Sequence, residues 1–211
     1  MSKAVLERLQ AKFGEAIVEV HSDFGDDTAV VRPSAWKAVC EFLHKDPQMD
    51  FDYLVDLCGV DYPERGVNNQ RMEVVLHLCS IGKRHRVRLK SRVGDEEMNG
   101  AEIDSITPIW PGANWFEREV YDMSGVTFRG HPDLRRILMY PEFVGHPLLK
   151  DYPANKTQPL VDYRTEEEAG VPLDKLAPFR EDEGMSFPRK EYGKDADDPR
   201  TTLDPYSTEA V

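Results

Sequence analysis

Carboxylates, arginines and histidines are concentrated in one stretch of this chain, between Glu117 and Pro153. Two Gly-His-Pro tripeptides lie in it, fifteen residues apart, with their histidines at positions 131 and 146. Imidazole and carboxylate side chains are the types that ligate metals and transfer protons. A set formed by His131, Asp133 and His146 could therefore hold a metal ion in a free-standing metalloenzyme.

The spacing of these residues does not favour such a site. Hydrolytic zinc sites often place two ligands on one helix, as in HExxH, whereas both histidines here lie between glycine and proline, in turns. The stretch has no nucleophile elbow, and the chain has no GxGxxG or P-loop motif. Its three cysteines include no CxxC pair, which is typical of reduced, buried thiols. A metalloenzyme is thus the weaker hypothesis.

An interaction surface fits the same residues better. A Gly-His-Pro turn would present a polar ring at a rigid, exposed tip, and arginines offer planar donors to carboxylates and carbonyls. We predict no catalytic, cofactor-binding or metal-binding residue in this chain. The predicted partner interface comprises Glu117, Arg118, Glu119, Asp122, His131, Asp133, Arg135, Arg136, His146, Lys150 and Asp151.

The overall charge and hydropathy limit the classes of partner. A net charge of −12 argues against nucleic acid, which requires a basic face. The sequence contains no run of about 18 apolar residues, so we expect no transmembrane helix. The N-terminus lacks the apolar segment of a signal peptide, which predicts folding in the cytosol.

Hydrophobic periodicity predicts the elements that must position this stretch. Helical spacing marks residues 3–13 and 36–43, and alternation marks strands at 16–20, 28–31, 51–58, 72–79 and 84–90. We predict an α+β fold, with an N-terminal α-β-β-α-β-β-β body, a mostly antiparallel sheet and an extended irregular C-terminal arm. The predicted divisions are an α+β domain (1–110), a signature helix with the Gly-His-Pro docking segment (111–153) and an acidic arm that wraps partner subunits (154–211).

Two local patterns add detail. Asn114 and Glu117 are spaced as a capping box at the start of a helix, Arg118 and Asp122 would pair one turn apart, and Gly125 would end the helix. Arg86, Arg88 and Lys90 form a row of cations on one face of the 84–90 strand. A solvated face is the usual explanation of such a row, and a patch that faces a partner is the alternative.

The central stretch resembles the signature of the C subunit of proton-pumping NADH:quinone oxidoreductase, the thirty-kilodalton hydrophilic subunit of respiratory complex I. The matching residues are Ala113 to Gly125, Gly130 to Leu138 and Gly145 to Pro153. Ser124 departs from the family, which usually has a bulky apolar residue there, and Leu149 stands where arginine is common. We therefore expect looser packing under the helix at Ser124 and the loss of one partner-facing cation at Leu149.

The resemblance implies a subunit without a cofactor in the quinone-reducing module of the peripheral arm, on the cytoplasmic side of the inner membrane. It would dock on the D, B and I subunits, and partner subunits would hold NADH, FMN, iron–sulfur clusters and quinone. The complex would carry electrons from NADH to quinone and translocate protons. Equivalent subunits of F420H2 dehydrogenases, plastid-type NDH complexes and membrane-bound hydrogenases remain alternatives.

Overall fold

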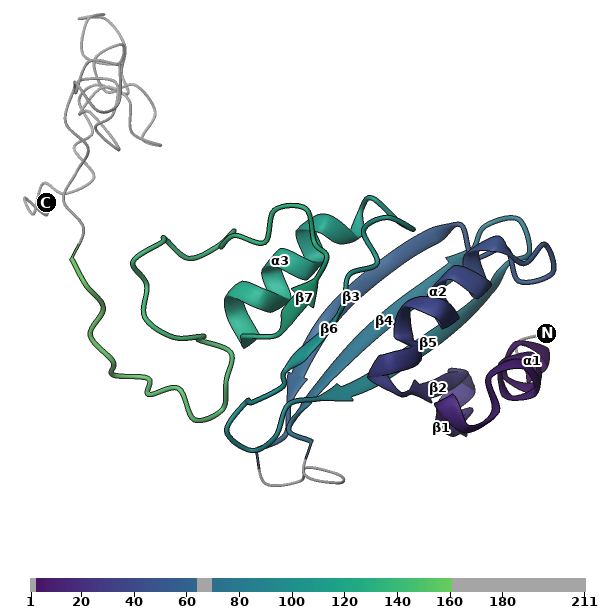
Figure 1. Cartoon of the computed structure of the whole chain (residues 1–211), viewed down its shortest axis with the longest axis horizontal. Helices are drawn as coiled ribbons and strands as arrows, with labels where there is room; N and C mark the ends of the chain where they lie inside the picture. Colours follow the sequence, from purple (N-terminus) through teal and green to yellow (C-terminus); the bar gives the residue numbers. More distant parts are fainter. Residues whose placement is uncertain (1–2, 64–69, 161–211) are drawn as a thin grey trace, which may run out of the picture. The chain divides into compact units, whose positions relative to one another are not determined.

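A computed structural model of the chain describes residues 3–63 and 70–160 (Figure 1). The described residues up to 159 form one structural unit. Its helices and strands are α1 (Lys3–Phe13), β1 (Ile17–His21), β2 (Thr28–Val31), α2 (Trp36–Lys45), β3 (Tyr53–Asp61), β4 (Met72–Ser80), β5 (His85–Val93), β6 (Glu102–Asp104), α3 (Ala113–Ser124) and β7 (Thr127–Arg129). Short 3-10 turns lie at Gly14–Ala16, Asp23–Gly25 and Pro33–Ala35. From residue 161, the predicted arm lies outside the described residues.

Five strands form one sheet in the order β1-β2-β5-β4-β3. All neighbours are antiparallel except β2 and β5, which are parallel because α2, β3 and β4 lie between them in the chain. The predicted α+β fold with a mostly antiparallel sheet is confirmed. Strands β6 and β7, which we did not predict, form a separate parallel pair, with β6 before α3 and β7 just after it in the chain. At three residues each, they are too short to show alternation.

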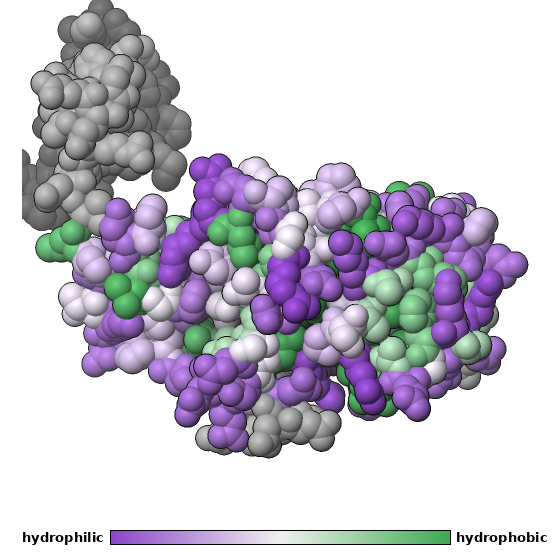
Figure 2. Space-filling view, in the orientation of Figure 1, coloured by the Kyte–Doolittle hydropathy of each residue, from purple (hydrophilic) through white to green (hydrophobic). Residues whose placement is uncertain are grey.

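The core lies between the sheet and the helices that cover one of its faces. Helix α2 buries Trp36, Val39 and Leu43 because these residues recur at helical spacing. They join Leu76 of β4 and Leu89 of β5 in a single apolar cluster. In Figure 1, α2 lies over the sheet, and in Figure 2 apolar side chains gather where α1 and α2 meet.

Strand alternation places polar residues on the opposite face of the sheet. In β5, the buried Val87 and Leu89 alternate with more exposed basic residues, as the sequence predicts. The turn between β4 and β5 begins at residue 81, between the strands predicted at 72–79 and 84–90. Strand β3 contains a bulge, because its pairing with β4 passes from Leu54 to Asp56 and leaves Val55 unpaired.

Candidate functional site around helix α3

Helix α3 approaches β3 closely because the contact is made by small residues. A Cβ atom placed on Gly59 of β3 would lie 3.0 Å from Val120 Cγ1 and 3.2 Å from Ser124 Oγ. Ser124 is buried at this contact. The expectation of looser packing at Ser124 is therefore wrong, since the small side chain permits a tight approach.

Restoring a bulky residue here should destabilise the chain. Ser124→Phe is expected to lower the free energy of unfolding by about 1–3 kcal/mol, because the ring must displace α3 from Gly59. Urea denaturation of the purified chain measures this loss. Glu119→Phe, which adds the same ring on the exposed side of α3, is the control. Equal stability of Ser124→Phe and the parent chain would show that the helix contact adapts to the larger side chain.

Glu117 points into the protein rather than toward a partner. Its Oε1 accepts a hydrogen bond from the Ile106 N–H at 2.7 Å, and its Oε2 accepts from the hydroxyls of Ser105 at 2.6 Å and Thr107 at 3.2 Å. Burial raises the pKa of Glu117, and these hydrogen bonds offset part of the rise. The predicted capping box is wrong, because α3 has no side-chain cap. Glu117 instead fastens the helix to the segment before it.

His131 fastens the first turn of α3 to the segment that follows the helix. Its side chain is fully buried, so the predicted exposed ring is wrong. Nδ1 accepts a hydrogen bond from the Asp133 N–H at 3.0 Å, which leaves Nε2–H to donate to the Asn114 carbonyl at 3.2 Å. These contacts assign a neutral ring with its proton on Nε2. Asn114, the predicted cap, lies inside the helix.

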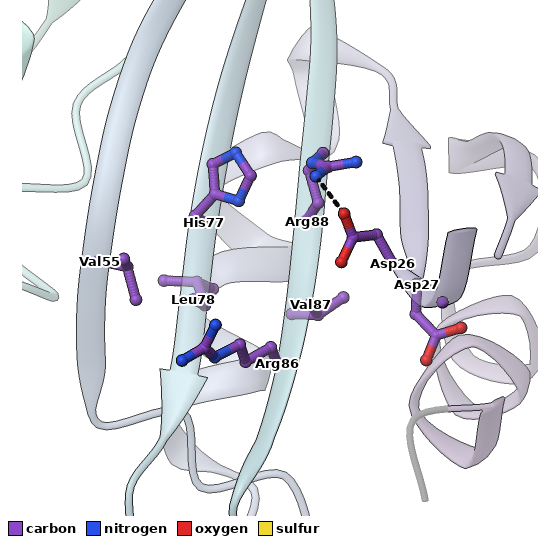
Figure 3. Close-up of a pocket in the computed structure, with 9 residues that line it drawn as sticks. Asp26, Asp27, Val55, His77, Leu78, Arg86, Val87 and Arg88 are labelled. Atoms are coloured by element: carbon purple, nitrogen blue, oxygen red, sulfur yellow. Dashed lines mark hydrogen bonds and ion pairs between the residues drawn. The ribbon is translucent and has the colours of Figure 1, made fainter. Parts of the chain in front are cut away.

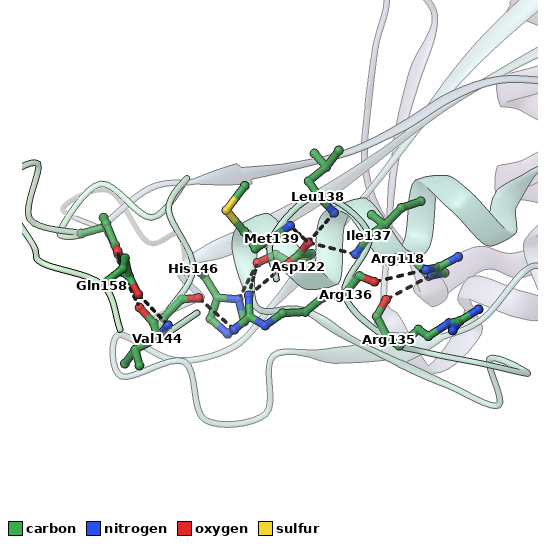
Figure 4. A network of polar contacts seen from close by, with 12 residues as sticks. Arg118, Asp122, Arg135, Arg136, Ile137, Leu138, Met139, Val144, His146 and Gln158 are labelled. Carbon is green, nitrogen blue, oxygen red and sulfur yellow. Dashed lines mark hydrogen bonds and ion pairs between the residues drawn. The ribbon is translucent and has the colours of Figure 1, made fainter. Parts of the chain in front are cut away.

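Asp122 anchors the segment that returns past the end of α3 (Figure 4). Its Oδ2 accepts hydrogen bonds from the N–H groups of Ile137, Leu138 and Met139 at 2.8–3.0 Å. Its Oδ1 accepts from Arg136 Nη1 at 2.6 Å. Burial alone would raise the pKa of Asp122, but these donors outweigh burial and hold the pKa below its ordinary value. The three successive amides form an anion-binding nest that the carboxylate fills.

Arg118 and Arg136 complete this attachment. Arg118 donates to the backbone carbonyls of Arg135 at 3.1 Å and Arg136 at 3.2 Å. The predicted Arg118–Asp122 pair is therefore wrong, since Asp122 pairs with Arg136. Arg136 also donates to the Gly145 carbonyl at 3.1 Å. The two guanidinium groups thus join α3, the 135–139 segment and the second Gly-His-Pro turn.

His146 holds the C-terminal end of α3. Its Nδ1 donates to the Asp122 carbonyl at 2.9 Å. Its ring lies against Gly125, where a Cβ atom would be 2.9 Å from His146 Cδ2. Gly125 ends the helix in the left-handed conformation at φ 80°, as the sequence predicts. The two Gly-His-Pro histidines therefore clamp opposite ends of one helix.

This arrangement separates the ligands of the metalloenzyme hypothesis. His131 binds the Asn114 carbonyl and His146 binds the Asp122 carbonyl, eight residues along the helix, or about 12 Å at 1.5 Å per residue. Within residues 3–63 and 70–160, no three histidine, cysteine or carboxylate side chains group as metal ligands. The proposed set of His131, Asp133 and His146 is therefore wrong.

A buried ion pair that we did not predict holds the Lys150-Asp151 pair to the body. Arg71 binds Asp61 through Nε at 2.7 Å and Nη2 at 2.8 Å, and it binds Asp151 through Nη1 at 3.0 Å. The Lys150 N–H donates to Asp61 Oδ2 at 2.8 Å. Hydrogen bonding to Arg71 lowers the pKa of Asp151, and in Asp61 the donors outweigh burial, so its pKa is also low. Arg71 and Asp61 lie outside the signature, and no spacing relates them to Asp151.

The predicted interface residues divide into two groups. Seven make the internal contacts described above: Glu117, Arg118, Asp122, His131, Arg136, His146 and Asp151. Four have exposed side chains or lie at exposed positions: Glu119, Asp133, Arg135 and Lys150. Leu149 is half-buried and packs against the core. The leucine that stands in place of the usual arginine therefore contributes to packing.

Comparison with known proteins identifies the family. The family model "Respiratory-chain NADH dehydrogenase, 30 Kd subunit" matches residues 29–158, which include the body and the signature block. The chain belongs to this 30 Kd subunit family. In its described part, no helix has the length and apolar character needed to cross a membrane.

Curated members of the 30 Kd subunit family support the match. The chain is 44% identical over 146 residues to the NADH-quinone oxidoreductase C 2 subunit of Rhizobium etli, covering 69% of this chain and 74% of the relative. It is 48% identical over 149 residues to the NADH-quinone oxidoreductase C subunit of a Roseiflexus species, covering 71% and 82%. The chain is thus a C-type subunit of an NADH-quinone oxidoreductase complex.

Two solved structures share the fold of the 30 Kd subunit family. A trypsin-resistant fragment of Nqo5 is 31% identical, with a TM-score of 0.52, and covers 64% of this chain and 100% of the fragment. A chain of an archaeal respiratory membrane complex, the membrane-bound sulfane sulfur reductase, is 20% identical, with a TM-score of 0.59, and covers 72% and 86%. At that identity, the second structure supports the fold alone.

Proposed function

We propose that this chain is a non-catalytic, cofactor-free subunit that holds the quinone-reducing module of its complex together. It docks on the D, B and I subunits at the cytoplasmic side of the inner membrane, and those and other partners hold NADH, FMN, iron–sulfur clusters and quinone. The observation that carries this proposal is the internal use of the chemically active side chains around α3. Residues that could have formed an active site instead build a rigid support.

The buried side chains of Glu117, Asp122 and His131 support a structural role because each has hydrogen-bond partners within the chain. Asp122 has four hydrogen-bond donors, and His131 uses both ring nitrogens. Glu117 binds a backbone amide and two hydroxyls. Satisfied networks of this kind rigidify a structure, which suits a supporting subunit.

The outer surface of the same block supports docking. Trp115 is 70% exposed on α3, and Leu138 and Leu148 are more than half exposed in the segments that follow. Large apolar side chains at the surface of such a rigid segment are typical of protein contact sites. Arg135 and Lys150 lie at exposed positions in the same segments and can pair with carboxylates at the rim of a contact. We assign this outer surface to the contact with the D, B and I subunits.

Substitution of each of two adjacent arginines distinguishes an effect on docking from an effect on folding. Arg136→Ala is expected to lower the free energy of unfolding by about 1–3 kcal/mol, because Asp122 loses one of its donors. Arg135→Ala should leave stability within about 0.5 kcal/mol, because that guanidinium is exposed and its one ion pair with a described residue is to the exposed Asp133. Urea denaturation measures both changes, and recovery with the membrane complex should fall for Arg135→Ala.

Purification of the complex tests the proposal as a whole. An epitope tag on the chain, in cells that lack the untagged copy, should recover the B, D and I subunits from solubilised membranes together with NADH:quinone oxidoreductase activity. Recovery of the chain alone from the soluble fraction would contradict the proposed docking. Assays of the recovered complex with NADH, reduced F420 and hydrogen identify the electron donor.

A further inference from the structure

The cation row of β5 divides into paired and unpaired members. Arg88 pairs with Asp26 at 2.7 Å, and Lys90 pairs with Glu73 at 3.0 Å. Arg86 is exposed, and within the part of the chain that the structure describes it has no ion pair or side-chain hydrogen bond. Figure 3 shows Arg86 reaching over β4, whereas Arg88 turns toward Asp26. Arg88 and Lys90 are neutralised by carboxylates of the chain, which explains them better than a simply solvated face does. Arg86 is not neutralised in this way by any described residue, and it can bind an anion.

Strand register places exposed apolar groups beside Arg86. Arg86 lies opposite Cys79 of β4, which lies opposite Tyr53 of β3, so the three residues form one row across the sheet. Tyr53 is about half exposed, and so is the bulge residue Val55 in the adjoining position. A guanidinium next to exposed aromatic and aliphatic groups has the composition of a protein contact site.

A pocket of about 220 Å³, lined by both charged and apolar residues, opens on this row (Figure 3). Its lining includes Arg86, His77, Val55 and Asp27. The volume is several times the ~30 Å³ that one water occupies in the liquid, so the pocket admits a side chain. A side chain with a carboxylate oxygen could accept hydrogen bonds from Arg86 there.

Phe24 precedes a pocket-lining residue in the chain and has an unfavourable backbone conformation. Its side chain is fully exposed, and its φ of 56° lies in the left-handed region. The next residue, Gly25, lines the pocket. An aromatic residue gains nothing from water contact, and the left-handed region disfavours any residue with a Cβ atom. The conformation of Phe24 therefore lowers the stability of the isolated chain.

We infer that the Arg86 pocket and its rim, formed by Phe24, Tyr53 and Val55, are a second docking surface that binds an acidic segment of a partner protein. A carboxylate of that segment pairs with Arg86, and an apolar side chain next to it packs on the rim. The surface lies on the sheet, and none of its residues belongs to the 117–153 block. The inference rests on the proposed function in one respect, since the partner is another protein of the same complex.

Charge distinguishes this partner from a lipid surface. Basic segments that bind anionic membranes carry clusters of about 4–8 cations. Here carboxylates of the chain itself neutralise Arg88 and Lys90, so among the described residues Arg86 is the member of the β5 cation row that has no ion pair. One unpaired arginine in a pocket suits one bidentate carboxylate, which a polypeptide side chain provides.

A photo-cross-linking residue at position 53, in the tagged chain and the intact complex, tests the inference. We expect a cross-link to a segment of another protein of the complex that contains Asp or Glu next to an apolar residue. Arg86→Glu should reduce the yield by about tenfold or more, because it replaces attraction with repulsion. Lys37→Glu, at an exposed position of α2, makes the same charge change elsewhere and should leave the yield unchanged.

Phe24→Gly separates binding from folding. Glycine adopts the left-handed region without strain, so the melting temperature of the isolated chain should stay the same or rise, while the cross-link yield falls. Cross-links only to lipid or to this chain, or a yield that Arg86→Glu does not change, would overturn the inference. In each case the complex can still be recovered with the tagged chain, which keeps the proposed function intact. Failure to recover the complex with the parent chain counts against the proposed function instead.

Discussion

Replacing Asp122 with asparagine is expected to lower the free energy of unfolding by about 3–5 kcal/mol at pH 7, because a buried charge network loses its anion. The Ile137, Leu138 and Met139 amides and Arg136 all donate to this carboxylate. An amide can accept at one atom only, and its NH₂ group would face other donors. Chemical denaturation of the purified chain measures the loss, and the denaturant slope should remain constant.

The pH dependence of this effect follows from the direction of the pKa shift. The pKa of folded Asp122 lies below its ordinary value of 3.8, so its stabilisation is present above that value and is lost as the pH falls through the folded-state pKa. The stability difference between the parent chain and Asp122→Asn should therefore shrink below about pH 4. Asp133→Asn, an exposed change in the same block, should alter stability by no more than about 0.5 kcal/mol. A difference that persists unchanged at low pH would contradict the role of the ionised carboxylate.

Arg71→Met is the second change with a large expected effect. Asp61 is 2% exposed at its side chain and, among the described residues, would retain only the Lys150 N–H as a donor, so we expect a loss of about 3–5 kcal/mol. The Lys150-Asp151 pair should also detach from the body, because Asp151 loses both contacts with Arg71. Denaturation measures the first effect, and protease cleavage after Lys150 measures the second.

A double-mutant cycle separates the ion pair from simple loss of packing. Asp61→Asn combined with Arg71→Met removes both charges, so the combined loss should be smaller than the sum of the two single losses. Asp151→Asn alone should have a smaller effect, because that carboxylate is largely exposed. Additive losses from Asp61→Asn and Arg71→Met would show that the two charges do not stabilise one another.

The sequence predicted the elements whose patterns are local. Strand β2 begins and ends at the predicted residues, and α1 spans the predicted helix. Gly125 ends α3 as predicted, because a left-handed helix cap depends only on local backbone geometry. Strand β5 continues to Val93, three residues beyond its predicted end, since Ser91 and Val93 maintain the alternation.

The contacts of the site could not be predicted in the same way. Asp122 finds its donors 14 to 17 residues later in the chain, and Arg71 meets Asp151 at a separation of 80 residues. Helical spacing suggested a pair between Arg118 and Asp122, but it carries no information on where a proline-rich segment returns. The density of charged residues in the block did indicate a network. Whether that network was internal or shared with a partner depended on burial, which the pattern does not specify.

The contacts of His131 and His146 with the two ends of α3 constrain the number of residues in the helix. His131 and His146 hold carbonyls near its two ends, and Glu117 holds its inner side. Adding or removing one residue within α3 would shift one end by about 1.5 Å and turn it by about 100°. Both clamps could not then engage together, whatever residue was inserted. Variation in chain length among relatives of this protein should therefore fall in the surrounding loops and spare the helix.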